Sequence, residues 1–246
     1  LIPYTLTTLV VLAISAVITL GLAVPAAWFV TQYEFYGRRI FDWALILPLA
    51  MPGYVMAYAW ADLMGVAGPL QSQFRALTGL SARDYWFPNL FSAPGLAFVL
   101  ASTLFPYVYI TARAAFSMQS STTIAAAKSL GATPLELFWR VALPAARPAI
   151  LGGLCLASME AAADYGAADF LGVRTLGVEI IRAWNSFSDP NTAARLALML
   201  MLIAGTFLIA ARVFQGRRGT QNTSTRWRTP VRVRLSTTSS VCVAGH

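Results

Sequence analysis

The sequence predicts an all-α, polytopic transmembrane helical bundle with about five spans. Hydrophobic residues make up 57% of the 246 residues, charged residues make up only 11%, and the mean hydropathy is +0.62. Soluble domains carry about 25% charged residues, so most of this chain is suited to lipid. The alternating pattern of a barrel strand is absent. Because helices satisfy their own backbone hydrogen bonds in a bilayer, the spans are predicted to be helical.

Five apolar runs supply these spans, since one helix needs roughly 20 apolar residues to cross a bilayer. The second run is broken by Pro48 and Pro52, the third contains Pro106, and the fourth contains no proline. Residues 1–214 form the predicted transmembrane domain, whereas residues 215–246 are polar and basic and form a predicted disordered tail. The predicted spans are residues 5–30, 43–64, 93–112, 149–171 and 196–211.

Two stretches between the spans have features of their own. Residues 65–92 contain a pattern at helical spacing and then three consecutive aromatic residues that suit the headgroup region. These residues are Gln71, Phe74, Leu77 and Leu80, followed by Tyr85, Trp86 and Phe87. They predict an interfacial helix on the outer face. Residues 172–195, with Trp184 and a turn at Asp189, are predicted to dip toward the membrane, and a plain connecting loop is the alternative for both stretches.

The most informative segment is residues 125–144, AAAKSLGATPLELFWRVALP, which places a polar helix-turn-helix between two apolar runs. Thr133, Pro134 and Glu136 have the spacing of the N-cap, N1 and N3 residues of a capping box. Gly131 stands where the preceding helix needs a left-handed residue at its end. Two short helices are therefore predicted to meet at a tight corner.

The second of these helices is predicted to have one apolar face. Leu135, Phe138 and Ala142 recur at the spacing of a helix face, and Trp139 lies beside them. Pro144 is predicted to end this helix, because proline lacks the backbone N–H that would continue it.

This segment resembles the loop that couples the membrane subunits of binding-protein-dependent ABC importers to their ATPase. The family's pattern is E-A-A, three residues, G, nine residues, I, one residue and L-P. Val141 stands in place of the Ile and Ala125 in place of the Glu, and the matching residues are Ala126, Ala127, Gly131, Leu143 and Pro144. The resemblance implies a fold like that of type I importer permeases. It also implies a coupling segment within residues 121–147 that contacts a dimer of cytoplasmic ATP-binding subunits.

Two further runs, residues 37–55 and 159–185, resemble iron(III)-type permeases within this family. This resemblance implies a pathway for ferric iron, delivered by a periplasmic binding protein, across a bacterial inner membrane. It also implies a second permease module. This chain is expected to be the first module of a longer product, cut near the junction. Permeases for thiamine, phosphonate or another small solute are similar and stay open as alternatives.

Three acidic residues lie in or near the fourth span, where a charge costs several kcal/mol unless it faces protein or water. They are Glu160, Asp164 and Asp169. Glu160 and Asp164 are four residues apart and are therefore predicted to share a helix face. We hypothesise that the three acids face the substrate pathway, and the alternative is a structural role between helices.

The placement of Lys and Arg predicts the orientation of the spans. With the coupling segment in the cytoplasm, 13 of these residues lie inside and 5 outside, as the positive-inside rule requires. Seven of the 13 lie at or beyond the last span, so the net charge of +8 is mostly a topology signal plus a basic tail, and it does not indicate nucleic-acid binding. The outside residues are Arg75, Arg83, Arg174, Arg182 and Arg195.

The sequence argues against an enzyme. It has no G-x-x-x-x-G-K-[ST] motif, so ATP must be bound by a partner subunit. The single His, His246, excludes Ser-His-Asp catalysis, and neither a metal site nor a cofactor is expected in this chain. An intramembrane aspartyl hydrolase would need a G-x-G-D motif, which neither Asp62 nor Asp164 has. A channel or a secondary transporter is the alternative from another class, but neither explains the capped helix-turn-helix.

Overall fold

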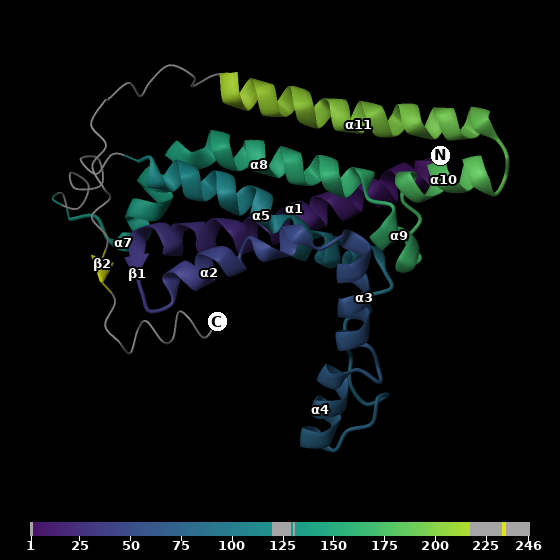
Figure 1. Cartoon of the computed structure of the whole chain (residues 1–246), viewed down its shortest axis with the longest axis horizontal. Coiled ribbons are helices and arrows are strands. Elements are labelled where there is room, and N and C mark those ends of the chain that lie inside the picture. The colour runs from purple at the N-terminus through teal and green to yellow at the C-terminus, as the bar shows by residue number, and fades with distance from the viewer. Residues whose placement is uncertain (1, 120–128, 130, 217–232, 235–246) are drawn as a thin grey trace. The chain divides into compact units, whose positions relative to one another are not determined.

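The computed structural model describes residues 2–119, 129, 131–216 and 233–234, which are mainly helical (Figure 1). The two short strands pair in parallel over only two residues each, and the other elements are helices. The fold class is therefore all-α, as predicted. The elements are α1 (Ile2–Gln32), β1 (Tyr33–Glu34), α2 (Arg38–Ala44), the 3₁₀-helix η1 (Leu47–Ala50), α3 (Gly53–Met64), α4 (Pro69–Thr78), α5 (Ala93–Ser117), α7 (Pro134–Glu136), the π-helix η2 (Leu137–Ala142), α8 (Leu143–Ala163), α9 (Gly166–Phe170), α10 (Leu176–Asn185), α11 (Pro190–Gly216) and β2 (Val233–Arg234).

The predicted number of spans is confirmed. In the part of the chain that the structure describes, four helical runs are long and apolar enough to cross a membrane, and a broken pair of helices brings the number up to five. The pair is interrupted at Met51 and Pro52, within the predicted proline-rich break. The runs are Ile2–Gln32, Ala93–Ser117, Pro134–Ala163 and Pro190–Val213, and the broken pair is Arg38–Ala50 with Gly53–Thr78.

The fourth span differs from its predicted range of residues 149–171. The helical run Pro134–Ala163 continues through Pro144, which was wrongly predicted to end a helix. Proline cannot donate a hydrogen bond to the residue four before it, and its ring crowds that carbonyl group. The π-helix Leu137–Ala142 lies directly before Pro144, and its wider turns let the run continue. At the other end, α8 stops at Ala163 and the backbone breaks before α9.

The chain forms two compact units, each assembled from three separate stretches. The long helices α1, α5, α8 and α11 contribute to both units. Unit 1 comprises Leu1–Ile18, Leu49–Leu104 and Ser158–Thr206, and unit 2 comprises Thr19–Pro48, Phe105–Ala157 and Phe207–His246.

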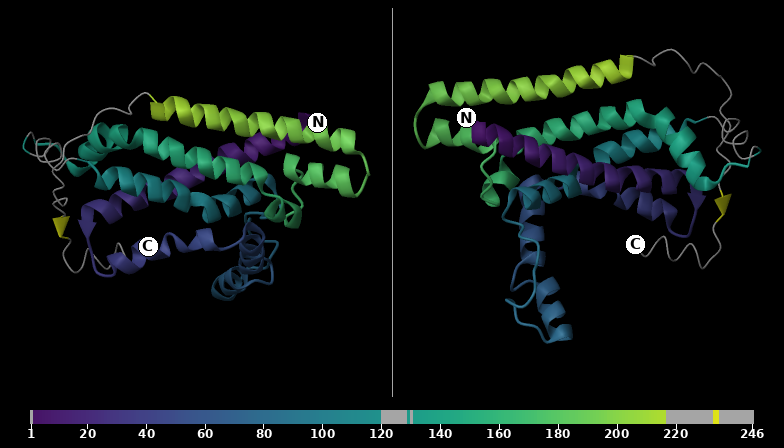
Figure 2. Two further views of the ribbon diagram at one scale, coloured as in Figure 1. Left: turned by 45° about the horizontal axis from the view of Figure 1, so that its top comes forward. Right: turned by 180° about the vertical axis from the view of Figure 1, so that it is seen from behind.

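Unit 2 has an aromatic core and one very close helix contact. The ring of Trp28 lies 5.4 Å from that of Phe116 and 5.3 Å from that of Phe138, measured between centroids. The second part of α5 and the first part of α8 lie side by side (Figure 2). A Cβ atom at Gly153 would lie 2.2 Å from the Thr111 Oγ1 atom, so this contact requires glycine.

In unit 1, α3 packs on α9 and α10 packs on α11. The turn predicted in residues 172–195 is present. Ser188 has a positive φ of 50°, and the Asp189 carboxylate accepts hydrogen bonds from the backbone N and the Oγ1 of Thr192. This stretch therefore contains a helix and a capped turn rather than a plain loop.

Residues 65–92 also contain the predicted helix, α4, which packs against α3 and ends at Gly79 with a left-handed φ of 70°. Leu80 lies beyond the end of α4, so it does not extend the predicted helical pattern. Most of the predicted tail, residues 215–246, lies outside the described residues, and its disorder stays a prediction.

Candidate functional site

The described half of the coupling segment has the predicted geometry. Gly131 has a φ of 82°, the left-handed conformation predicted for it. The Oγ1 of Thr133 accepts a hydrogen bond from the Glu136 N at 3.3 Å, and the Thr133 N donates to the Glu136 Oε2 at 3.0 Å. The capping box is therefore confirmed. The other half, with Ala125, Ala126 and Ala127, lies outside the described residues.

The predicted apolar face of this helix is wrong in part. Ala142 is buried, but Leu135 is 67% exposed and Trp139 is 59% exposed. Leu137, which the prediction left out, is buried instead. The prediction assumed a period of 3.6 residues, whereas the π-helix that begins at Leu137 shifts each side chain around the axis. Leu135 and Trp139 consequently form an exposed apolar pair.

The remaining predicted coupling residues lie at the transition into α8. Val141 is the fifth residue of the π-helix, and Leu143 and Pro144 are the first two residues of α8. All three are half-buried. The side chain of Gln119, two residues beyond α5, donates a hydrogen bond to the Ala142 carbonyl oxygen at 2.8 Å. This bond ties the start of α8 to the neighbouring helix of unit 2.

The structure places Glu160 on α8, Asp169 on α9 and Asp164 in the break between these helices. Asp164 lies one residue beyond the end of α8 at Ala163, so it is not on the same helix as Glu160, but the two carboxylates are close enough to interact electrostatically. Glu160 and Asp169 are exposed, and the Tyr165 hydroxyl donates to the Asp169 Oδ2 at 3.2 Å. Within the described residues, no group of three or more His, Cys, Asp or Glu side chains could hold a metal ion.

Asp164 has a densely packed environment in unit 1. Its Oδ1 accepts hydrogen bonds from the backbone N of Ala167 at 3.0 Å and of Ala168 at 3.3 Å, so it caps the start of α9. Its Oδ2 faces the start of α3, where a Cβ atom at Gly53 would lie only 2.6 Å away. The sequence analysis did not predict that Gly53 makes room for the Asp164 carboxylate. The Pro52-Gly53 pair was the sequence signal that could have indicated a special position at the start of α3.

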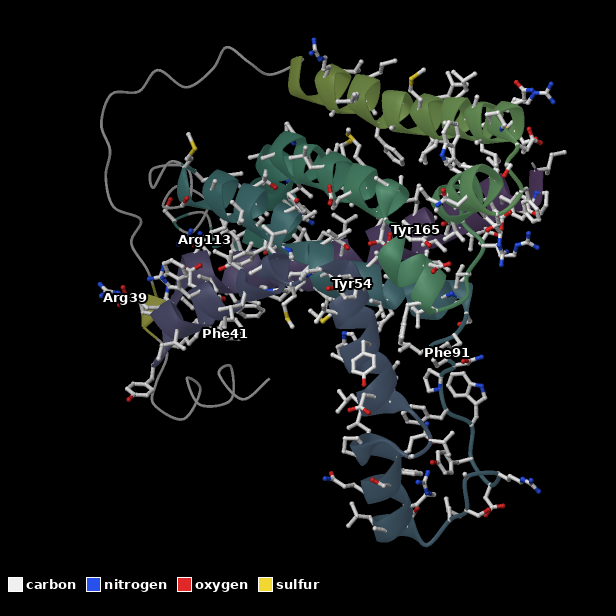
Figure 3. All side chains as sticks on the ribbon, turned by 45° about the vertical axis from the view of Figure 1, so that its right-hand side comes forward. Arg39, Phe41, Tyr54, Phe91, Arg113 and Tyr165 are labelled. Atoms are coloured by element: carbon white, nitrogen blue, oxygen red, sulfur yellow. The ribbon has the colours of Figure 1, made fainter. Side chains whose placement is uncertain are left out.

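Aromatic side chains surround this junction of α3 and α9. A Cβ atom at Gly166 would lie 3.1 Å from the Tyr54 Cβ, so the two backbones approach closely. Figure 3 labels Tyr54 and Tyr165, both of which are exposed. The Tyr58 ring lies 5.9 Å from that of Phe170. The junction therefore combines close backbone packing with exposed aromatic side chains.

An ion pair in unit 2 joins α2 to α5. Asp42 on α2 pairs with the Arg113 guanidinium, and its Oδ1 also accepts a hydrogen bond from the Tyr109 hydroxyl at 2.6 Å. Tyr109 is fully buried, whereas Arg113, labelled in Figure 3, is half-buried. Sequence reasoning noted the charges but missed their pairing, since the two residues are 71 positions apart.

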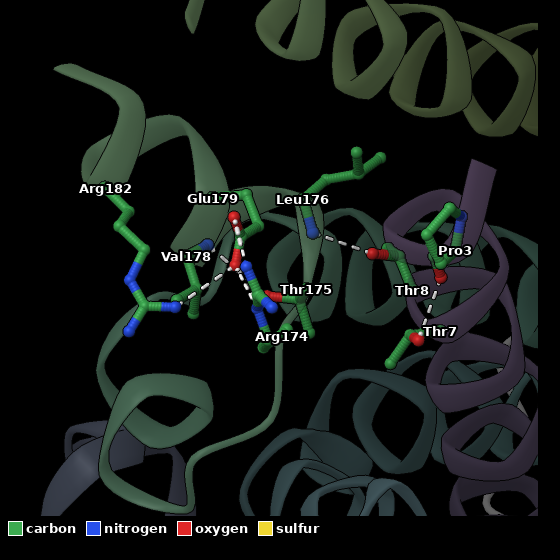
Figure 4. A network of polar contacts seen from close by, with 9 residues as sticks. All are labelled: Pro3, Thr7, Thr8, Arg174, Thr175, Leu176, Val178, Glu179 and Arg182. Carbon is green, nitrogen blue, oxygen red and sulfur yellow. Dashed lines mark hydrogen bonds and ion pairs between the residues drawn. The ribbon is translucent and has the colours of Figure 1, made fainter. Parts of the chain in front are cut away.

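A second charged network lies at the start of α10 (Figure 4). The Glu179 side chain is only 6% exposed and pairs with Arg174 at 2.7 Å and with Arg182 at 3.5 Å. The hydrogen bond to Glu179 raises the pKa of the Arg174 guanidinium. Thr8 of α1 accepts a hydrogen bond from the Leu176 N at 2.9 Å, which joins α1 to this network. Two arginines on one buried carboxylate leave a positive charge at the surface.

Comparison with known proteins identifies the family. A family model described as "Binding-protein-dependent transport system inner membrane component" matches residues 14–217. The chain belongs to this family. The matched range includes the coupling segment, the Asp42 ion pair and the break at Asp164, and the chain is accordingly a multi-pass membrane protein.

Two curated relatives illustrate the range of this family. The chain is 32% identical to the sulfate transport system permease protein CysT of Salmonella typhimurium over 145 residues, which are 59% of this chain and 50% of that protein. It is 24% identical to the Fe(3+)-transport system permease protein FbpB 2 of Haemophilus influenzae over 199 residues, which are 81% of this chain and 35% of that protein. The matched part of the chain thus spans 50% of the length of the sulfate relative and 35% of the length of the iron relative.

Solved structures show the same fold. A bacterial alginate ABC transporter, in complex with an alginate pentasaccharide-bound periplasmic protein, superposes with a TM-score of 0.70 at 15% identity. The match covers 90% of this chain and 80% of that chain. At this identity, the likeness shows the fold alone.

Proposed function

We propose that this chain is a membrane subunit of an ATP-driven importer in a bacterial inner membrane, where it forms part of the translocation pathway. The family match over residues 14–217 is the observation that carries the proposal. A second permease module would complete the pathway. ATP would be bound and hydrolysed by a dimer of separate cytoplasmic subunits, and this chain would need no cofactor of its own.

The coupling segment would receive the energy of ATP hydrolysis. Gly131 has the left-handed φ of a tight turn, and the capping box fixes the start of the helix that follows it. From Pro134 the helical run continues for 30 residues to Ala163. A displacement of the corner would therefore move this whole run as one body, which is a common way to transmit a switch.

We propose ferric iron, delivered by a periplasmic binding protein, as the substrate. The iron relative matches 81% of this chain, which is the larger share, and supports this choice. Sulfate is the second candidate, because the sulfate relative is more similar in sequence, at 32% identity, over a shorter part. Both candidates are small inorganic ions, but their charges are opposite.

Uptake measurements separate these substrates. Cells that lack their own iron and sulfate importers and express the chain with its partner subunits should accumulate radioactive ferric iron and not sulfate. Accumulation of sulfate alone would replace the first candidate by the second. Accumulation of thiamine or phosphonate and of neither ion would contradict both candidates.

The exposed acids Glu160 and Asp169 stay predicted pathway residues. If they help to pass a cation, then Glu160→Gln, which keeps the shape of the side chain but removes its charge, should slow ferric uptake without lowering membrane abundance. A sulfate pathway would not be slowed by this change, because a carboxylate repels an anion. Unchanged ferric uptake by Glu160→Gln with Asp169→Asn would remove both acids from the pathway.

Gly131→Val tests the coupling role. A β-branched residue in the left-handed region costs roughly 1–2 kcal/mol, so the corner should distort. Uptake and copurification of the ATP-binding subunit should fall at least about tenfold while the protein stays in the membrane.

Gly79→Val is the matched control, because Gly79 also has a positive φ of 70° and also has open space around it, but lies outside the coupling segment. It should leave the copurification unchanged. Equal uptake and copurification by the Gly131→Val variant and the unchanged chain would show that the corner is a passive loop.

A further inference from the structure

Helix α4 has an unusual distribution of polar and apolar side chains. Leu70, Phe74 and Leu77 recur at the spacing of one helix face and are all exposed, Leu77 to 87%. Gln71 points the other way and is only 6% exposed. A polar side chain therefore faces the protein while an apolar stripe faces outward. We call Leu70, Phe74 and Leu77 the α4 stripe.

Hydrogen bonds fix the rotation of α4 about its axis. The Gln71 Nε2 donates to the Met64 carbonyl oxygen at 2.7 Å, and the Gln71 Oε1 accepts from the Tyr85 hydroxyl at 2.9 Å. Arg75, one turn later, donates to the Tyr85 hydroxyl at 3.2 Å and to the Val66 carbonyl oxygen at 2.7 Å. Turning the α4 stripe inward would break these bonds, so the stripe stays exposed.

The surroundings of α4 show what can cover the stripe. Only the four residues Gly65–Gly68 separate α4 from α3, and the two helices together form the second half of the broken pair, Gly53–Thr78, so α4 lies at the end of that apolar run. Trp86, on the segment that packs beside α4, is 84% exposed, and the Phe74 ring lies 4.9 Å from that of Tyr85. Trp and Tyr near the end of a span are typical of the membrane–water boundary.

We propose that α4 lies on the bilayer surface, with the α4 stripe in the boundary between acyl chains and headgroups and with Trp86 beside it. The bilayer is an apolar partner that every multi-pass membrane protein has. The exposed Ser72 and Gln73, on another side of α4, would face water, as in other interfacial amphipathic helices. This inference does not depend on the transported substrate or on the ATP-binding partner.

Lipid quenching of a fluorescent label tests the proposal on the full chain. Cys155 and Cys242 are first replaced by Ala, and a single label is placed at Leu77→Cys or Leu70→Cys. The protein is then reconstituted in nanodiscs of phosphatidylcholine and phosphatidylglycerol, with a doxyl quencher either near the headgroup or at the middle of the acyl chain. We expect both sites to be quenched, and more strongly by the shallow doxyl group.

Ser72→Cys is the matched control, since it lies on the same helix but on the other side. It should be quenched at least about twofold less than Leu77→Cys. Equal quenching at Ser72 and Leu77 would overturn the proposal, because the helix would then be either fully inserted or fully in water. Absence of quenching at both stripe sites would also overturn it, because the stripe would then not contact lipid.

Discussion

The Asp164 carboxylate lies where three helices of unit 1 start close together. It caps α9 through its Oδ1, and its Oδ2 packs against Gly53 at the start of α3. At α10, a Cβ atom on Gly177 would lie 3.2 Å from the Asp164 carbonyl oxygen. Asp164 is therefore suited to hold the break of the second span against the break after α8. A carboxylate that accepts two backbone hydrogen bonds has a structural reason to be there even if no cation passes it.

A double-mutant cycle measures this contact. Gly53→Ala places a methyl group 2.6 Å from the Asp164 Oδ2, so it should destabilise the chain by about 1–3 kcal/mol. In the Asp164→Ala background the methyl group has room, and the cost of Gly53→Ala should fall by about 1 kcal/mol or more. Thermal unfolding in detergent gives both values. Additive effects of the two changes would show that Gly53 and Asp164 do not interact.

Asp164→Asn distinguishes the structural role from a role in a cation pathway. The amide oxygen can still accept the two hydrogen bonds of α9, so stability and uptake should stay closer to those of the unchanged chain than in Asp164→Ala. If charge is what matters, Asp164→Asn should lose as much uptake as Asp164→Ala while its unfolding temperature stays high.

At the scale of elements, the α7–η2–α8 run combines a stiff start with an exposed apolar pair, Leu135 and Trp139. Large exposed aromatic side chains at a protein surface often dominate binding energy. Leu135 lies within the capping box and Trp139 follows it by one helical turn, so both lie close to the hydrogen bonds that fix the start of α7. Under the proposed coupling function, these two residues would contact the ATP-binding subunit.

We expect Trp139→Gln to weaken copurification of the ATP-binding subunit at least about tenfold without lowering the abundance of the chain. Trp184→Gln is the control, because Trp184 is similarly exposed, at 63% against 59%, but lies on α10. Titration of the purified ATP-binding subunit against each variant gives the comparison. Equal affinities for the two variants would exclude Trp139 as an anchor.

At the scale of the whole molecule, the orientation of the spans decides whether the coupling segment can reach a cytoplasmic partner. In a chain without native cysteines, Ser81→Cys should react with a membrane-impermeant thiol reagent added outside intact cells. Met118→Cys, at an exposed position just beyond α5, should react only after the cells are opened. The reverse pattern would contradict both the orientation and the proposed coupling.

The sequence by itself determined the features that depend on neighbouring residues. Span number and approximate position follow from hydropathy, because roughly 20 apolar residues are needed wherever a helix crosses a bilayer. The turn at Gly131 and the cap between Thr133 and Glu136 were predictable because each involves residues at most three positions apart. Such local features do not depend on how distant parts of the chain pack.

Only the tertiary structure decided which faces are buried and which distant groups meet. The π-helix Leu137–Ala142 changes the helical pitch after Leu135, so Leu135 and Trp139 are exposed while Ala142 is buried, and hydrophobic periodicity cannot reveal such a local change of pitch. The break after Ala163 placed Asp164 between α8 and α9 rather than within one continuous helix. The contact of Asp164 with Gly53 depends on how α3 and α9 pack, because a missing Cβ atom matters only when another helix approaches it closely.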